Sequence, residues 1–270
     1  ERLGAIAPGR YADILFLEEL RKPTPARVML NGHMVAERGV ASVSLPPLNT
    51  QMDSLAAQWR NDARRWTPTG ALFKLGLDAA NGPTTTLRLP VLNLANAAIT
   101  RQLDVDVRLV DGHIDRTLHA DLLHIALVER NGRWISQSAI KGFADRLGGL
   151  ASSIGCAAHP LVIGASPADM AQALERLLAM FGGIVLVENG EVLLASPLEM
   201  FGVMTDRTLA DIAGDQIRFG ELMKERGYPY GSLMYTMQFL ACDFLPEVRL
   251  TSAGLVNIRT AEVLAPVRPL

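Results

Sequence analysis

Cysteine is scarce in this chain: Cys156 and Cys242 are the two that occur in 270 residues. They have no metal-type spacing and cannot build a disulfide framework, so we expect a protein of the reducing cytoplasm. A surplus of basic charge is also lacking, with 26 Lys and Arg against 28 Asp and Glu. This balance makes a nucleic-acid partner unexpected. No apolar run reaches the roughly 20 residues of a membrane-spanning helix, so no membrane partner is expected either.

Several catalytic signatures are missing as well. The sequence has no glycine-rich phosphate loop, no Gly-x-Ser-x-Gly, no His-Glu-x-x-His and no His-x-His pair. The chain begins at Glu1, without the basic start and apolar stretch of a signal peptide. We therefore expect a chain that opens in mid-sequence and lacks a complete active site. No catalytic or metal-ligating residue is predicted in it.

What is present is an ordinary globular composition, 49% hydrophobic and 20% charged. The first segment predicts three short strands. Ile14 to Leu17 follows a Pro-Gly turn, and Ala26 to Ala36 is a hairpin on Asn31-Gly32, the dipeptide most typical of tight hairpins. Three strands with exposed edges do not form a stable sheet alone. We expect their partners upstream of Glu1.

The next segment predicts a connection. Pro46-Pro47 indicates a linker. Leu55, Trp59 and Ala63 recur at helical spacing, which predicts a helix from Asp53 to Trp66 with Asp53 as its cap. The predicted organisation is therefore terminal strands over residues 1–45, a linker and helix over 46–83, and a domain over 84–270.

Strand patterns open this domain. Residues 84–90 are expected to be extended, and 99–110 alternate apolar and charged residues, as a half-buried strand requires. Residues 122–129 form a second apolar run before the turn Asn131-Gly132. Residues 138–147 are interpreted as helical.

Hairpins and helices follow in alternation. Two apolar runs, 150–154 and 161–163, precede a helix that Ser166 caps and that reaches about Met180. A hairpin over 183–196 has an Asn-Gly turn, and a helix over 208–226 is expected after an N-cap at Asp206. The tail is interpreted as mostly irregular. Without a regular strand-helix-strand repeat, the pattern predicts an α+β fold.

The break between the two apolar runs is the main candidate site. It contains Ser152, Ser153, Cys156 and His159 among small residues that permit close backbone approach. These four are candidates for a substrate loop. The alternative is a tight packed turn in which His159 bonds to a backbone carbonyl and Cys156 is a buried, inert thiol.

The other polar residues have simpler interpretations. His119 and His124 flank Asp121 and invite a metal site, but their spacing fits neither one strand face nor a helical pair. Surface or edge histidines are the alternative. His33 and His113 stand beside hairpin turns, where we expect them to be solvated. Glu129 with Arg130, and Lys141, are interpreted as solvated surface charges.

Two early segments resemble the closing strands of amidohydrolase-superfamily enzymes. They are Gly4-Ala-Ile-Ala-Pro-Gly-Arg-Tyr-Ala-Asp-Ile-Leu and Val28-Met-Leu-Asn-Gly-His-Met-Val. The later motifs resemble the C-terminal domain of bacterial adenine deaminases, in the family's order. They are Ile125-Ala-Leu-Val-Glu-Arg, residues 139–143, Gly149-Leu-Ala-Ser-Ser-Ile, Asp169-Met170, residues 182–192, Pro197-Leu198 and Gly202-Val-Met-Thr-Asp.

This resemblance implies an enzyme in which the present chain is a C-terminal part. The family hydrolyses adenine to hypoxanthine and ammonia with manganese or iron, and its metal ligands lie on a TIM barrel that would precede Glu1. No cofactor is then expected in this chain itself. Its own barrel, a purine and further copies of the protein are the implied partners.

Two departures from the family's pattern indicate a divergent member. The family's loop usually reads His-Asp-Ser-His, where this chain has Cys156-Ala-Ala-His159, and the family's histidine after Glu-Arg is Asn131. A different purine or cyclic amidine as substrate is one interpretation. The other is that the domain is a structural or oligomerisation module that braces the barrel.

Overall fold

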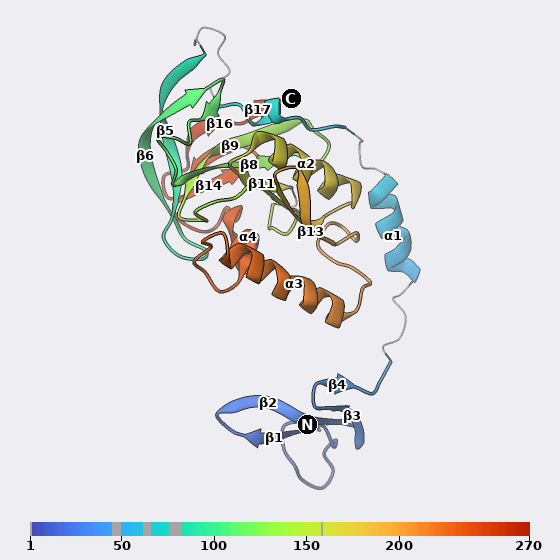
Figure 1. Cartoon of the computed structure of the whole chain (residues 1–270). Helices are drawn as coiled ribbons and strands as arrows, with labels where there is room; N and C mark the ends of the chain where they lie inside the picture. Colours follow the sequence, from blue (N-terminus) through green and yellow to red (C-terminus); the bar gives the residue numbers. More distant parts are fainter. Residues whose placement is uncertain (1, 45–49, 62–65, 76–82, 158) are drawn as a thin grey trace. The chain divides into compact units, whose positions relative to one another are not determined.

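The computed structural model describes residues 2–44, 50–61, 66–75, 83–157 and 159–270 (Figure 1). The chain divides into two compact units, Glu1–Thr50 and Gln51–Leu270. Each unit is described by itself.

The first unit is an antiparallel four-stranded sheet in chain order. Its strands are β1 (Ile14–Glu19), β2 (Lys22–Leu30), β3 (His33–Glu37) and β4 (Val40–Ala41). The predicted hairpin at Asn31-Gly32 is confirmed, since both residues have positive φ, 49° and 78°. Large apolar side chains nevertheless stay exposed on this sheet, among them Leu15 and Leu30.

The second unit opens with helix α1 (Thr50–Asn61), whose first residue is the last of the first unit. The predicted cap at Asp53 is wrong, because the helix already begins at Thr50 and Asp53 lies inside it. The predicted linker at Pro46-Pro47 lies outside the described residues. A short 3-10 helix, η1 (Gly70–Phe73), follows in the described part of this segment.

The second unit is built on a large mixed sheet. Its order is β13-β12-β10-β11-β8-β9-β5-β6-β7, and β17 pairs with β9. The strands are β5 (Thr84–Leu94), β6 (Thr100–Val110), β7 (His113–Ile114), β8 (Leu122–Val128), β9 (Trp134–Lys141), β10 (Gly149–Ser152), β11 (Leu161–Gly164), β12 (Gly183–Glu188), β13 (Glu191–Pro197) and β17 (Arg268–Pro269).

Helices cover both faces of this sheet. Helix α2 (Pro167–Ala179) packs on β10, β11 and β12 through a core that includes Met170 and Leu174. The opposite face carries α3 (Leu209–Lys224), α4 (Leu233–Leu240) and a small sheet of β14 (Val248–Thr251), β15 (Gly254–Asn257) and β16 (Glu262–Pro266) (Figure 1). Burial on both faces explains why β8, β11 and β12 are almost continuously apolar.

The α+β class and most predicted hairpins and helices are confirmed. Ser166 caps α2, with its Oγ accepting a bond of 3.2 Å from the Asp169 N–H. The turn at Asn189-Gly190 has positive φ at both residues, 54° and 78°. No β/α barrel occurs in the part of the chain that the structure describes.

Three local predictions are wrong. Residues 138–141 belong to β9, which lies inside the sheet between β8 and β5. Helix α3 is capped by Thr208, whose Oγ1 accepts from the Asp211 N–H, and Asp206 is not its cap. The tail is ordered as α4 and the sheet β14–β16 rather than irregular. Both α4 and β14 owe their order to the core under the large sheet, a long-range cause that local patterns do not show.

Candidate functional site

One end of the large sheet brings together two segments that are distant in the sequence. The turn after β8 and the loop between β10 and β11 lie side by side, because β8 and β11 are antiparallel neighbours. The N–H of Val128, the last residue of β8, donates to the carbonyl of Pro160, just before β11, at 2.9 Å, so the pairing continues to the edge of the loop. Glu129, Arg133, Trp134 and His159 lie at this end, and we call them the His159 cluster.

His159 is held against an aromatic wall. Its ring contacts the Trp134 indole edge-on, with centroids 4.9 Å apart. Its Nδ1 is buried and has no hydrogen-bond partner among the described residues, so the predicted bond from this nitrogen to a backbone carbonyl is not present. Burial lowers the pKa of His159 below its ordinary value, so the imidazole is neutral at pH 7.

Glu129 organises the neighbouring turn. The interpretation as a solvated pair with Arg130 is wrong for Glu129, whose side chain is buried and pairs with Arg133 at 3.0 Å. Its Oε2 also accepts from the N–H groups of Asn131 and Arg133. Burial raises the pKa of Glu129, but the hydrogen bonds from Arg133 and Asn131 outweigh burial and lower it. The turn therefore presents an ionised carboxylate close enough to affect the pKa of His159.

The hydroxyls of Ser152 and Ser153 form hydrogen bonds with backbone groups. Ser153 Oγ accepts from the Gly183 N–H at 2.7 Å and donates to the Gly202 carbonyl. Ser152 is buried, and its Oγ accepts from the Ile154 N–H at 3.1 Å. Both hydroxyls thus fix the start of the loop rather than point into free space.

Cys156 lies against the end of α4. The interpretation as a buried thiol is wrong, because Cys156 is exposed and Cys242 is the buried one. The two sulfurs are 2.7 Å apart. Both also approach the Gln238 carbonyl, at 3.8 Å for Cys156 and 3.4 Å for Cys242.

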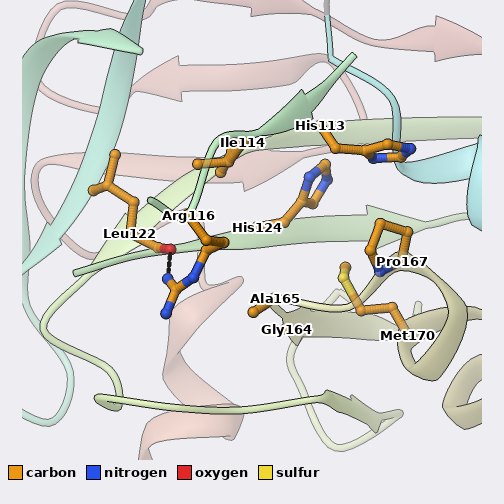
Figure 2. Close-up of a pocket in the computed structure, with 9 residues that line it drawn as sticks. All are labelled: His113, Ile114, Arg116, Leu122, His124, Gly164, Ala165, Pro167 and Met170. Atoms are coloured by element: carbon orange, nitrogen blue, oxygen red, sulfur yellow. Dashed lines mark hydrogen bonds between the residues drawn. The ribbon is translucent and has the colours of Figure 1, made fainter. Parts of the chain in front are cut away.

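A small cavity lies elsewhere in this unit, between β7, β8 and the start of α2 (Figure 2). His113 and His124 both line this cavity, and its free space of ≈ 10 Å³ is about that of one water. His124 is buried rather than at the surface, its Nε2 lies 3.2 Å from Gln137 Oε1, and burial lowers its pKa to about 3. His113 is half-buried, so its predicted solvation is wrong.

The remaining histidines and Lys141 do not assemble a metal site. His119 Nε2 accepts from the Arg108 N–H, whereas His124 Nε2 bonds to Gln137 Oε1. Lys141 forms a half-exposed ion pair with Asp121 at 2.6 Å. Across the described residues, no group of three His, Cys, Asp or Glu side chains could hold a metal ion. Nor do these residues include a helix long and apolar enough to cross a membrane.

Sequence reasoning identified His159 but missed the rest of the cluster. Glu129 directly follows the buried strand β8, just before Asn131-Gly132, and a carboxylate there could have been recognised as the acceptor for the turn's N–H groups. Trp134 gave no such signal, because its contact with His159 depends on the pairing of β8 with β11.

A comparison with known families matches the part of the chain that contains the His159 cluster. A family model described as adenine deaminase C-terminal domain matches residues 97–262. The chain belongs to this family. Its similarity extends beyond the domain: an adenine deaminase of Moorella thermoacetica is 35% identical over 94% of the chain. Adenine deaminase 2 of Carboxydothermus hydrogenoformans is 30% identical over 97% of the chain.

The adenine deaminase relatives are much longer than this chain. The matches cover 42% of the Moorella protein and 45% of the Carboxydothermus protein. A putative adenine deaminase of Bacillus subtilis, 28% identical over 98% of the chain, is covered to 43%. The chain therefore corresponds to less than half of each of these adenine deaminases.

Proposed function

We propose that this chain is the C-terminal portion of a metal-dependent hydrolase that converts adenine and water to hypoxanthine and ammonia. The observation that carries this proposal is the similarity to adenine deaminases over nearly the whole chain. We further assign the protein to the cytoplasm, as its two unbonded cysteines suggest.

The metal of this reaction does not fit the present chain. The described residues offer no group of three ligands, and the cavity that His113 and His124 line has a free space of ≈ 10 Å³. We therefore place the manganese or iron in a barrel formed by the part of the protein that the relatives have in addition. There the metal would activate the water that attacks the purine.

The contribution of this chain would come from the His159 cluster. A neutral imidazole beside an ionised carboxylate can accept a proton or hold a polar edge of a ligand. The positions that depart from the family's pattern, Asn131 and Cys156, lie on the two segments that meet at this cluster. These replacements favour a related purine or cyclic amidine as an additional or preferred substrate.

Ammonia release tests the proposal. The full-length protein, loaded with manganese or iron, is expected to release ammonia from adenine. Release from another aminopurine but not from adenine would overturn the adenine assignment and keep the hydrolase class. Absence of release from all of them, with the metal bound, would overturn both.

A structural role is the second candidate, and one observation favours it. The hydroxyls of Ser152 and Ser153 are used inside the fold, as expected for a bracing domain. In this role the chain would pack against its own barrel and join copies of the protein into a homo-oligomer. Light scattering of the full-length protein would test this: an active monomer would contradict it.

A further inference from the structure

We propose that Cys156 and Cys242 form a redox-sensitive pair that a two-electron oxidant such as a peroxide converts to an intramolecular disulfide. The pair lies where the β10–β11 loop crosses the end of helix α4. The two residues are 86 positions apart in the sequence, yet their sulfurs are 2.7 Å apart. The crosslink does not depend on the proposed function.

The surroundings hold the two sulfurs together in the reduced state. Both approach the same acceptor, the carbonyl of Gln238 in the last turn of α4. Cys242 is fixed by its backbone, since its N–H donates to the Phe239 carbonyl at 3.1 Å. Oxidation therefore requires little movement of either chain segment.

The two thiols differ in exposure, and this difference determines which of them reacts first with the oxidant. Cys156 is exposed and meets the oxidant first, whereas Cys242 is completely buried. Burial and the neighbouring Cys156 raise the pKa of Cys242, so this thiol keeps its proton until it reacts. Arg249, which is buried and acts on Cys242, offers a positive charge to the sulfur as the proton leaves.

The chemistry balances with peroxide as the only co-reactant. The Cys156 sulfur attacks one peroxide oxygen and the O–O bond breaks; the displaced hydroxide takes up the thiol proton and leaves as one water. The Cys242 sulfur then attacks Sγ of the resulting sulfenic acid, and its proton leaves with the hydroxyl group as a second water. Two thiols are oxidised by two electrons, and one peroxide is reduced to two waters.

The consequence is a covalent tie between the loop that carries His159 and helix α4. In the reduced chain the two sulfurs approach each other and the Gln238 carbonyl without a covalent bond between the segments. A disulfide that closes a ring of this length restricts the unfolded chain strongly. Oxidation is therefore expected to raise the Tm of the second unit by about 5 °C or more.

Peroxide treatment of the full 270-residue chain tests the proposal. The expected result is the loss of both free thiols, a mass lower by two hydrogens, and a crosslinked peptide joining Cys156 and Cys242. In the Cys242→Ala variant, dimedone is expected to trap a sulfenic acid on Cys156. The Cys156→Ser variant, changed at an exposed position, serves as the control that shows no Tm rise on oxidation.

Three outcomes would overturn the proposal. Both thiols could stay free after peroxide has reacted with the methionines, or Cys156 could gain oxygen without crosslinking. A disulfide between two chains in place of the internal one would contradict the pairing equally. The Tm of Cys156→Ser is measured before and after oxidation. A folding defect lowers the Tm of the reduced variant, whereas a missing crosslink removes only the rise on oxidation.

Discussion

The imidazole of His159 lies edge-on against the indole of Trp134, with ring centroids 4.9 Å apart and ring planes inclined by 82°. Trp134 begins β9, and His159 precedes β11, so the contact joins two turns at one end of the sheet. The indole also shields the imidazole from water. The properties of His159 should therefore respond to a change at Trp134.

We predict that replacing Trp134 by Leu raises the pKa of His159 toward its ordinary value of 6.5. Burial is the largest cause of the lowered pKa, and a smaller side chain admits water to the ring. NMR titration of the histidine ring protons, with His159 assigned from a His159→Gln variant, measures the change. Tyr11→Leu, at an exposed aromatic of the first unit, is the matched control. An unchanged His159 midpoint in Trp134→Leu would contradict the prediction.

His124 should make the second unit less stable in mild acid. Its folded pKa, about 3, lies below the unfolded value of 6.5, so the unfolded chain binds a proton that the folded chain excludes. Stability from this group is complete above pH 6.5 and falls as the pH decreases toward 3. Between neutral pH and about pH 5 the loss is at most about 2 kcal/mol.

Urea unfolding at these two pH values tests the role of His124. The His124→Gln variant, which keeps a polar group near Gln137, should lose less stability on acidification than the parent chain. His33→Gln, at an exposed histidine of the first unit, should behave as the parent. Parallel losses in the parent and in His124→Gln would assign the acid sensitivity to other groups.

Two glycines are predicted to respond oppositely to alanine. A Cβ on Gly149 would lie 2.4 Å from the backbone of α2, so Gly149→Ala must push the helix away from the sheet. Gly214 lies inside α3 with open space around it, and Gly214→Ala should stabilise that helix by about 1 kcal/mol. Denaturant unfolding should show a loss of about 3 kcal/mol for Gly149→Ala. Equal effects at both positions would contradict the close packing of α2.

Arg249 is predicted to be essential for the order of the tail. Its side chain is completely buried, and its guanidinium donates to five backbone carbonyls, those of Ala98, Phe239, Leu240, Leu245 and Pro246. Burial lowers its pKa to about 10, so it stays charged at neutral pH.

The Arg249→Met variant leaves these carbonyls without their donor in the core. We expect a loss of about 3 kcal/mol or more in denaturant unfolding, against less than about 0.5 kcal/mol for Arg218→Met at an exposed site. A small effect of Arg249→Met would mean that water replaces the guanidinium.

Local sequence signals predicted much of this fold. The Asn-Gly dipeptides at Asn31 and Asn189 predicted two hairpins, because both residues of such a tight turn adopt positive φ. Alternation over β6 predicted its strand, since its charged residues are exposed and Val107 and Leu109 are buried. Ser166 and Pro167 marked the start of α2. These features depend on residues close together in the sequence.

Other features depend on contacts between residues that are far apart in the sequence, which local patterns do not reveal. Residues 138–141 look helical alone but are drawn into β9 by their pairing with β8. The tail becomes ordered because Arg249 binds carbonyls from three separate segments. At the candidate site, His159 stood out as a loop residue. That Glu129 and Trp134 are its neighbours follows only from the pairing of β8 with β11.

The most direct test of the proposed function is the kcat of ammonia release from adenine by the full-length, metal-loaded protein and its His159→Gln variant. If the His159 cluster takes part in binding or proton transfer, kcat or kcat/KM should fall on the order of 100-fold. The His33→Gln protein should retain its activity, because His33 is exposed in the first unit. Unchanged kinetic parameters in His159→Gln, with an unchanged fold, would contradict a role for this end of the sheet in deamination.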